Sequence, residues 1–224
     1  SLDYAICDNK VVIADHYRPP YSYDGTTFTI YDTSITYVPS CLTFFNDRLW
    51  MGNTVESATV YRNRVRWSEQ TDHTDFAVSN YVDLPYMAGE LRRLIPMGSL
   101  LAAYFRDAIY LARATNITTL PFNFFRVETG GVGLAGTRAI VSIPNGHYFI
   151  GQNDIYLLSN EGLKRLKCPV RDLFFTGDID PDRSYVSQDP MNKRIVFGFS
   201  GDDGIIDKVW SYYYEVDAWA YDSV

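Results

Sequence analysis

The chain has 224 residues, 46% of them hydrophobic and 16% aromatic, with 20 basic and 27 acidic side chains and a net charge of −7. This hydrophobic content is ample for a one-domain β architecture of the larger kind, and flat aromatic rings suit strands. The acidic charge is spread without a block of one sign, which argues against a nucleic-acid clamp because such a surface repels phosphate.

Five blade-like units are predicted along the chain. Each has three or four runs of strand length with alternating or continuous apolar character, separated by turn signals. The units cover residues 4–38 (with strands near 11–14 and 27–31), 41–76, 91–127, 136–167 and 184–222. The clearest turn signals are Asp24-Gly25, Asn145-Gly146, Glu161-Gly162 and Asp202-Asp203-Gly204. Two connectors, residues 88–94 and 170–175, are each expected to form a helical turn or two.

One phrase recurs at intervals of roughly 45 to 60 residues, a period that favours a propeller or a solenoid over one irregular sheet. It consists of an apolar run, a tight polar turn and a second apolar run with an aromatic residue, and it occupies residues 42–51, 100–111 and 146–158. Each copy is typical of a β-hairpin. The prediction is an all-β, β-propeller-like fold of about five blades in a single domain, 1–224. Both ends read as interrupted blades, so we expect a fragment of a larger propeller protein.

Two glycine-containing motifs are interpreted as structural. Gly131-Val-Gly133-Leu-Ala-Gly136 fits G-x-G-x-x-G, but the residues that follow it read as a strand, whereas a dinucleotide site needs a helix there. A glycine-rich connection between blades is therefore predicted. Residues 22–28 nearly match the Asp-box of sialidase-type propellers, which predicts a hairpin and no sugar chemistry.

Acidic and histidine clusters give weak metal signals. Asp178, Asp180 and Asp182 alternate as in calcium loops, but Arg183 stands where the EF-hand glycine would be, and a polar loop is the preferred interpretation. Asp202 and Asp203 are interpreted as a turn. The stretch Asp72-His73-Thr-Asp75 is interpreted as a solvated loop, since no second histidine lies nearby.

The sequence predicts no catalytic, cofactor-binding or metal site. His16, His73 and His147 fall in different units, and no G-x-S-x-G elbow occurs. The cysteines Cys7, Cys41 and Cys168 are widely spaced and form no C-x-x-C pair, which favours buried free thiols. The run 210–214, Trp-Ser-Tyr-Tyr-Tyr, is interpreted as an alternating aromatic strand and, less favourably, as a sugar-stacking surface.

Several motifs, in their order along the chain, resemble proteins of tailed bacteriophages. Residues 44–52 (FFNDRLWMG), 63–68 (NRVRWS) and 74–76 (TDF) follow one another as in a motif common in their virion proteins, and residues 11–15 and 20–25 look like another blade of the same proteins. Residues 133–166 are similar to a further stretch, in which Arg138-Ala-Ile-Val141 and Asp154-Ile-Tyr156 match, while Leu134 and Ala135 stand where a cysteine is customary. The family is that of propeller-containing tail proteins, including nozzle and head-to-tail stabilising proteins of short-tailed phages, and the resemblance covers most of the chain.

The resemblance implies a structural, non-enzymatic component of a phage or prophage tail, located in the virion and assembled in the bacterial host cytoplasm. It implies self-assembly into a ring, contacts with other tail or portal proteins, genome retention, and passage of DNA without specific DNA binding, with no membrane partner and no cofactor. Arg48, Asp47 and Trp67 are expected to be structural, Arg48 by pairing with a carboxylate between blades. Two alternatives stay open: a carbohydrate-binding or glycan-cleaving β-propeller, and a propeller scaffold for partner proteins in a cell.

Overall fold

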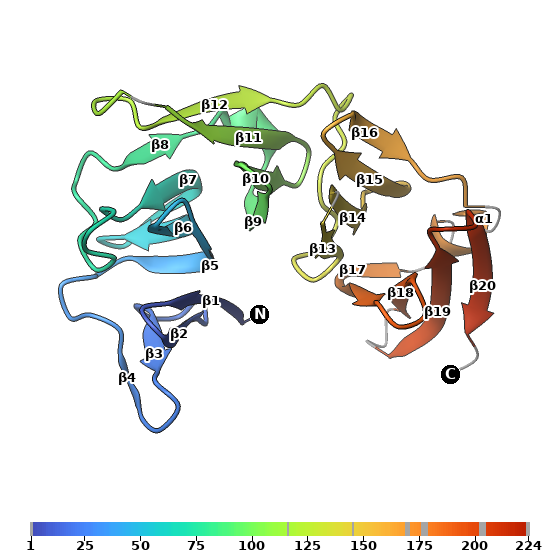
Figure 1. Ribbon diagram of the computed structural model, residues 1–224, viewed down its shortest axis with the longest axis horizontal. Coiled ribbons are helices and arrows are strands. Elements are labelled where there is room, and N and C mark those ends of the chain that lie inside the picture. The colour runs from blue at the N-terminus through green and yellow to red at the C-terminus, as the bar shows by residue number, and fades with distance from the viewer. Residues whose placement is uncertain are drawn as a thin grey trace. The chain divides into compact units, whose positions relative to one another are not determined.

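The protein consists of five four-stranded antiparallel sheets, each made of consecutive strands in the order of a propeller blade (Figure 1). The computed structural model describes residues 2–115, 117–144, 146–168, 171–175, 179–201 and 205–222. The prediction of an all-β fold with five blade units is confirmed, since each predicted unit corresponds to one sheet.

We number the sheets as blades in chain order. Blade 1 contains β1 (Asp3–Cys7), β2 (Lys10–Ala14), β3 (Tyr21–Tyr23) and β4 (Phe28–Ile30). Blade 2 contains β5 (Val38–Phe45), β6 (Arg48–Glu56), β7 (Thr59–Trp67) and β8 (Tyr81–Asp83). Blade 3 contains β9 (Leu91–Met97), β10 (Leu100–Phe105), β11 (Ile109–Ala114) and β12 (Phe122–Arg126). Blade 4 contains β13 (Ile140–Ile143), β14 (Gly146–Ile150), β15 (Ile155–Ser159) and β16 (Gly162–Arg165). Blade 5 contains β17 (Ile179–Asp189), β18 (Arg194–Gly201), β19 (Ile206–Tyr213) and β20 (Ala218–Asp222).

The chain divides into two compact units, Ser1–Arg126 with blades 1 to 3 and Val127–Val224 with blades 4 and 5. In the first unit β5 contacts both β1 and β9, and in the second β13 contacts β17, so the first strand of each blade lies beside that of the next blade in the same unit. The blades therefore pack face to face, because each sheet must bury its apolar side chains against another layer.

Two hydrophobic clusters fill the first unit. The cluster between blades 1 and 2 includes Val12, Leu49 and Met51, which are fully buried. The cluster between blades 2 and 3 is built around Trp50 and Leu101, also fully buried. Leu49, Trp50 and Met51 are consecutive in β6, so this strand supplies side chains to both of its faces, which explains the continuous apolar run in its sequence.

The recurring phrase forms a hairpin in all three places, as predicted, but not the same hairpin of the blade. Residues 42–51 lie in β5 and β6, the first two strands of blade 2. Residues 100–111 lie in β10 and β11, and residues 146–158 in β14 and β15, which are the second and third strands of their blades. In blade 2 the turn is made by Asn46 and Asp47, whose φ values of 50° and 56° match a two-residue hairpin turn of type I′.

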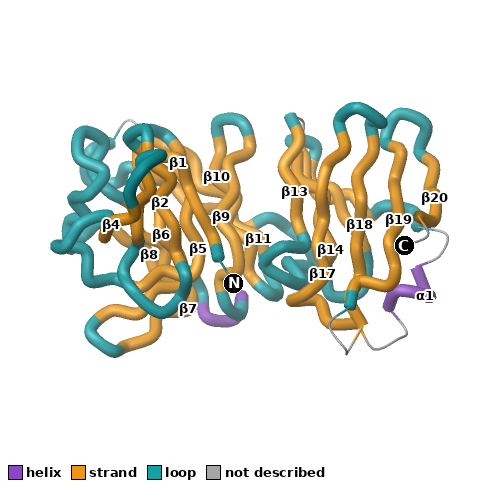
Figure 2. The backbone as a smooth tube through the Cα atoms, turned by 90° about the horizontal axis from the view of Figure 1, so that it is seen from below, coloured by secondary structure: helices purple, strands orange, loops and turns teal. Residues whose placement is uncertain are grey.

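Helical structure is short (Figure 2). A 3-10 turn covers Tyr86–Ala88 and an α-helix covers Arg171–Phe175, which confirms the second helical connector for its described part; Val170 lies outside the described residues. The prediction of helix over 88–94 is wrong beyond Ala88, because Leu91 begins β9. Leu91 and Leu94 pack into the blade 2–3 cluster while β9 pairs with β10, and this tertiary pairing outweighs local helix preference.

The turn predictions that can be assessed agree with the structure. Asp24 Oδ1 accepts hydrogen bonds from the N–H groups of Thr26 and Thr27, both at 2.9 Å, and forms the β3–β4 hairpin that the Asp-box-like sequence predicts. Glu161-Gly162 closes the β15–β16 hairpin. Asn145 and Asp202-Asp203-Gly204 lie outside the described residues.

Gly52 in β6 marks a close approach between blades 2 and 3. A Cβ atom there would lie 2.4 Å from Leu91 Cδ2 and 2.8 Å from Cys41 Sγ. We therefore expect Gly52→Ala to lower the free energy of unfolding by about 1–3 kcal/mol through overpacking. Urea denaturation measures this, and Thr59→Ala, at an exposed site in the same sheet, should change stability by less than about 0.5 kcal/mol. Equal stability of Gly52→Ala and the native protein would contradict the close packing of these two blades.

Candidate functional site

The glycine motif is not a nucleotide cradle. Residues 131–136 lie in the connection between β12 and β13, and the chain enters β13 without a helix. Gly131 has a φ of 92°, as expected where a connection needs the left-handed region. The phosphate-binding geometry requires a helix N-terminus at this point, so the motif serves the loop.

The described acidic residues of the calcium-like stretch bind groups of the protein itself. Asp180 Oδ1 accepts the N–H of Asp182 at 3.0 Å, and Asp180 Oδ2 lies 3.3 Å from Arg183 Nε. Asp178, Asp202 and Asp203 lie outside the described residues. Asp72 accepts hydrogen bonds from the backbone and hydroxyl of Thr74, which is the arrangement of a polar turn.

The three histidines have separate environments. His147 is fully buried in β14. Burial lowers the pKa of His16. His73 was expected in a solvated loop, but only 13% of its side chain is exposed, because the ring packs edge-on against Phe44 with centroids 5.1 Å apart.

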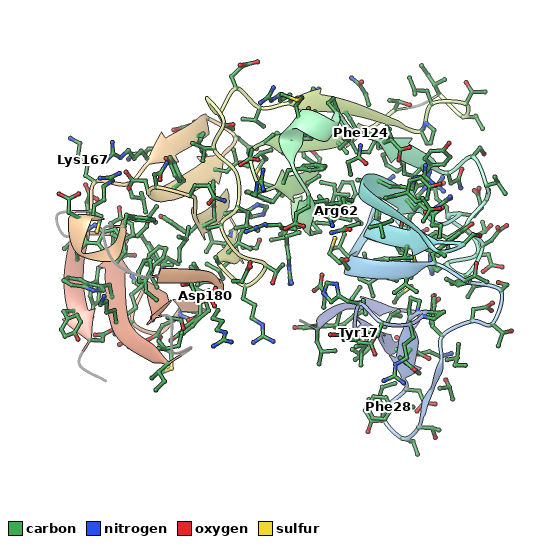
Figure 3. All side chains as sticks on the ribbon, turned by 180° about the vertical axis from the view of Figure 1, so that it is seen from behind. Tyr17, Phe28, Arg62, Phe124, Lys167 and Asp180 are labelled. Atoms are coloured by element: carbon green, nitrogen blue, oxygen red, sulfur yellow. The ribbon has the colours of Figure 1, made fainter. Side chains whose placement is uncertain are left out.

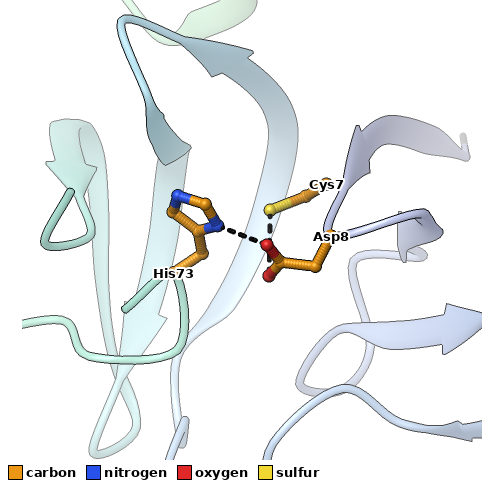
Figure 4. Close-up of side chains that lie close together, drawn as sticks. All are labelled: Cys7, Asp8 and His73. Carbon is orange, nitrogen blue, oxygen red and sulfur yellow. Dashed lines mark hydrogen bonds and ion pairs between the residues drawn. The ribbon is translucent and has the colours of Figure 1, made fainter. Parts of the chain in front are cut away.

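His73 meets Cys7 and Asp8 of blade 1 (Figure 4). His73 Nδ1 lies 2.8 Å from Asp8 Oδ1, and Cys7 Sγ lies 3.5 Å from Asp8 Oδ2. The hydroxyl of Tyr31 lies 3.6 Å from Cys7 Sγ. Burial raises the pKa of the Cys7 thiol to about 11, with the negative charge of Asp8 adding to the effect while the Tyr31 hydrogen bond opposes it. The predicted burial of Cys7 and Cys41 is confirmed, whereas Cys168 is half-buried.

A buried carboxylate connects three blades. Asp3 in β1 accepts the backbone N–H of Leu42 in β5 at 3.0 Å and forms an ion pair with Arg93 in β9 at 2.8 Å. Burial raises the pKa of Asp3, and the charge of Arg93 and the N–H groups of Leu42 and Tyr4 offset only part of this effect. The contact thus ties together the first strands of blades 1, 2 and 3.

A second ionic network occupies one face of blade 2. Arg66 binds Glu56 with two hydrogen bonds of 2.7 Å, and Arg64 binds Glu56 at 3.0 Å and Asp83 at 2.7 Å. Tyrosine rings cover the two guanidinium groups, with Tyr61, Tyr37 and Tyr81 at 3.6 to 5.0 Å from them. Burial alone would raise the pKa of Glu56, but hydrogen bonds from Arg66 and Thr54 and the charges of Arg66 and Arg64 outweigh it and lower the pKa.

Arg48 and Trp67 in blade 2 both contact Phe122 of blade 3. Arg48 Nη1 donates to the carbonyl of Ser68 at 2.5 Å, lies 3.5 Å from Glu69 Oε2, and has its guanidinium 5.8 Å from the ring centre of Phe122 in blade 3. The carboxylate partner of Arg48 is Glu69, which follows β7 in the same blade, whereas the sequence predicted an ion pair between blades. Arg48 contacts the next blade through the Phe122 ring instead. Trp67 packs on Phe122, with ring centroids 5.4 Å apart.

In the second unit, Asp154 connects blade 4 to the helix that follows it. Its Oδ2 atom pairs with Arg165 and lies 3.0 Å from Arg171 Nε in α1. A pocket of about 780 Å³ nearby is lined by Arg165, Lys167, Cys168, Asp217 and Trp219. The Trp219 indole donates to the Lys167 carbonyl at 3.0 Å, and its ring packs on Tyr212 with centroids 4.9 Å apart, which gives it a structural role. Residues 210–213 of the aromatic run lie in β19, as the strand interpretation predicts, and Tyr214 follows the strand; burial does not alternate along the run, since Ser211 and Tyr212 are both buried.

Blade 1 presents one apolar face that blades 2 and 3, the other blades of its unit, leave uncovered. The face opposite Asp3, Ala5 and Cys7 carries two cross-strand rows of large apolar side chains. The rows are Tyr4, Ile13, Tyr21, Ile30 and Ile6, Val11, Tyr23, Phe28. Tyr4, Ile6, Phe28 and Ile30 are 55% to 67% exposed. Phe28 lies on the outermost strand of the blade (Figure 3). We call this surface the outer face of blade 1.

Comparisons with known proteins show the fold. No family model matches the chain, and no curated protein matches it. Among solved structures it is similar to the extracellular domain of BT4673 from B. thetaiotaomicron, with 13% identity and a TM-score of 0.58 over 99% of this chain and 27% of that one. It is also similar to the N-terminal domain of Nup159 (9% identity, TM-score 0.58, 100% of this chain and 60% of that one) and to the Dos1 propeller (12% identity, TM-score 0.53, 94% and 56%).

The fold and these neighbours define the class: the chain is an all-β, propeller-like protein. It spans about a quarter of the first neighbour and less than two thirds of the other two. Within the described residues, no helix has the length and apolar character needed to cross a membrane.

The Asp3 contact generates a stability prediction. We expect Asp3→Ala to lower the free energy of unfolding by about 3–5 kcal/mol, because it leaves Arg93 and the Leu42 N–H without their partner in a buried site. Asp3→Asn should cost less, since its amide oxygen still accepts the Leu42 N–H. Urea denaturation of both variants tests this, and a native-like midpoint for Asp3→Ala would show that the contact does not hold the blades.

The lowered pKa of Glu56 generates a pH prediction. Its contribution is present above the ordinary value of 4.5 and is lost as pH falls through the lower folded value. Glu56→Gln should therefore have a lower Tm than the native protein at neutral pH. The difference should shrink as the pH falls further below 4.5 and the native carboxylate takes up its proton. Thermal melts over this range measure it, and a difference that grows toward acid would contradict the assignment.

Proposed function

We propose that the chain is a structural, non-enzymatic component of a phage or prophage tail, of the nozzle or head-to-tail connector type, located in the virion. The order of the motifs at residues 44–52, 63–68, 74–76 and 133–166 supports the family. The contacts of Arg48, Trp67 and Asp154 support the structural role, since these motif residues pack and pair with the protein itself.

The observation that carries the proposal is the outer face of blade 1. Its four most exposed apolar side chains lie on one sheet face, and contiguous apolar surface of this kind marks an interaction site. The opposite face of the same blade already packs on blade 2 through Ala5, Cys7 and Val12. A second copy of this chain, which brings further apolar sheets, is the partner we propose for this face. Repetition of a contact between two different surfaces closes a ring when the rotation between neighbouring copies divides a full turn.

The charge of the chain suits a conduit for DNA. The net charge is −7, and a lumen of this sign repels phosphate, so that a genome passes without being held. The bore would need no DNA-binding residues. Contacts with other tail or portal proteins belong to the same proposal, with aromatic and arginine side chains as the contact chemistry.

The experiment is the oligomeric state, measured by light scattering behind a sizing column and by negative-stain imaging. We expect a concentration-dependent oligomer with ring-shaped particles. Ile6→Glu should weaken association by roughly tenfold or more, because it places a charge in the apolar face. Val78→Glu is the matched control, since Val78 is 82% exposed and lies away from this face.

A monomer at every concentration would overturn self-assembly. If that monomer also bound immobilised glycans, the carbohydrate-binding alternative would replace the tail proposal. An oligomer that Ile6→Glu leaves intact would keep the tail role but move the interface to another surface.

A further inference from the structure

Three side chains from two blades bring together the donor atoms that transition metals prefer. Cys7 ends β1, Asp8 begins the turn after it with a φ of 51°, and His73 lies in the loop that follows β7. One sulfur, one nitrogen and one oxygen atom from these residues all lie within 4.8 Å of one another. Among the described residues, this is the group of three or more histidine, cysteine and acidic side chains with such spacing.

The geometry of the group suits a tetrahedral ion. The two oxygens of Asp8 face different partners, since Oδ1 lies 2.8 Å from His73 Nδ1 and Oδ2 lies 3.5 Å from Cys7 Sγ (Figure 4). Zinc bound to sulfur, nitrogen and oxygen at about 2.0–2.3 Å holds its ligands roughly 3.3–3.8 Å apart. The His73–Asp8 pair, at 2.8 Å, must therefore open by about 0.5 Å to reach this spacing, while the Cys7–Asp8 pair, at 3.5 Å, already has it.

We propose that Cys7 Sγ, His73 Nδ1 and the Asp8 carboxylate form a binding site for a zinc-like divalent cation, with water as the fourth ligand. The donor set of thiolate, imidazole and carboxylate selects zinc over magnesium or calcium, which prefer oxygen ligands. This site could not be predicted from the sequence, because 65 positions separate Asp8 from His73.

The surroundings hold these donors in place. His73 Nε2 is buried without a hydrogen-bond partner, and Asp47 Oδ1 lies 3.7 Å from it. When Nδ1 binds an ion, Nε2 carries the proton and points toward this carboxylate, which is the arrangement that orients metal-binding histidines. Phe44 fixes the ring from its edge, and the Tyr31 hydroxyl, 3.6 Å from Cys7 Sγ, is placed to donate a hydrogen bond to a thiolate.

The proposed ligands differ in their exposure to solvent. The side chain of Asp8 is 47% exposed and gives an ion a path from solvent, while Cys7 closes the inner side of the site. Cys7 and Asp8 belong to blade 1, and His73 follows the third strand of blade 2. A bound ion would thus join two blades by coordination bonds, and because it binds only the folded chain, it would raise the Tm.

The test uses the untagged full chain with Co²⁺ and Zn²⁺. Co²⁺ should produce two spectral features: a thiolate-to-cobalt charge-transfer band in the ultraviolet, and the visible absorption bands of a tetrahedral ion. Both should saturate at one ion per chain. Cys7→Ser should abolish the charge-transfer band, and His73→Gln, which removes a direct ligand, should weaken binding by at least about 100-fold, the upper end of the loss for a group that only supports a ligand. Asp8→Asn, at a half-exposed turn position, gives a variant that should fold normally and bind more weakly.

Cys168→Ser is the matched control, because Cys168 forms no disulfide, belongs to the other unit, and its loss should leave the band unchanged. At one fixed concentration, Zn²⁺ should raise the Tm of the native chain and of Cys168→Ser by more than that of Asp8→Asn. Absence of the charge-transfer band in the native chain would overturn the proposal. So would a band that survives Cys7→Ser or disappears in Cys168→Ser.

Discussion

The arrangement of the first unit depends on a polar contact that fixes how its three apolar sheets stack on one another. Hydrophobic burial drives blades 1, 2 and 3 together, but it is non-directional and allows one sheet to slide over the next. The Asp3 carboxylate removes this freedom, because its two oxygens are used by β5 and β9 at once. Taking a charge out of water is costly, and the rise in the pKa of Asp3 reflects that cost. We interpret the contact as one that specifies the arrangement more than it adds to stability.

Blade 2 repeats this principle away from its first strand. Glu56, Arg64 and Arg66 form a network on the sheet face that also carries Leu49 and Met51, and tyrosine rings shield it from water. Each arginine has its carboxylate partner, so the ions are buried in pairs, as buried charges must be. An apolar cluster near the first strands and an ionic network farther out together make blade 2 a stiff layer. Stiff layers of this kind suit a protein whose proposed work is mechanical.

Sequence patterns predicted the local structure well and the long-range contacts poorly. The hairpins at residues 42–51, 100–111 and 146–158 could be recognised because turn residues and apolar alternation act over a few positions. Leu91 to Leu94 was misassigned as helix because its strand character comes from pairing with β10. The meeting of His73 with Cys7 and Asp8, and that of Asp3 with Arg93, could not be predicted. Both depend on which blades are neighbours, which no local pattern encodes.

The position of the recurring phrase bears on how such chains diverge. In blade 2 it forms the hairpin that includes the first strand, whereas in blades 3 and 4 it forms the middle hairpin. A comparison of the repeats that superposes these phrases would displace one blade against another by a whole strand. Residues of β5, the first strand of its blade, would be matched with those of β10, the second strand of its blade. Ancestry of the blades is therefore better traced by strand order than by phrase similarity, and the hairpin is the unit that keeps a recognisable sequence.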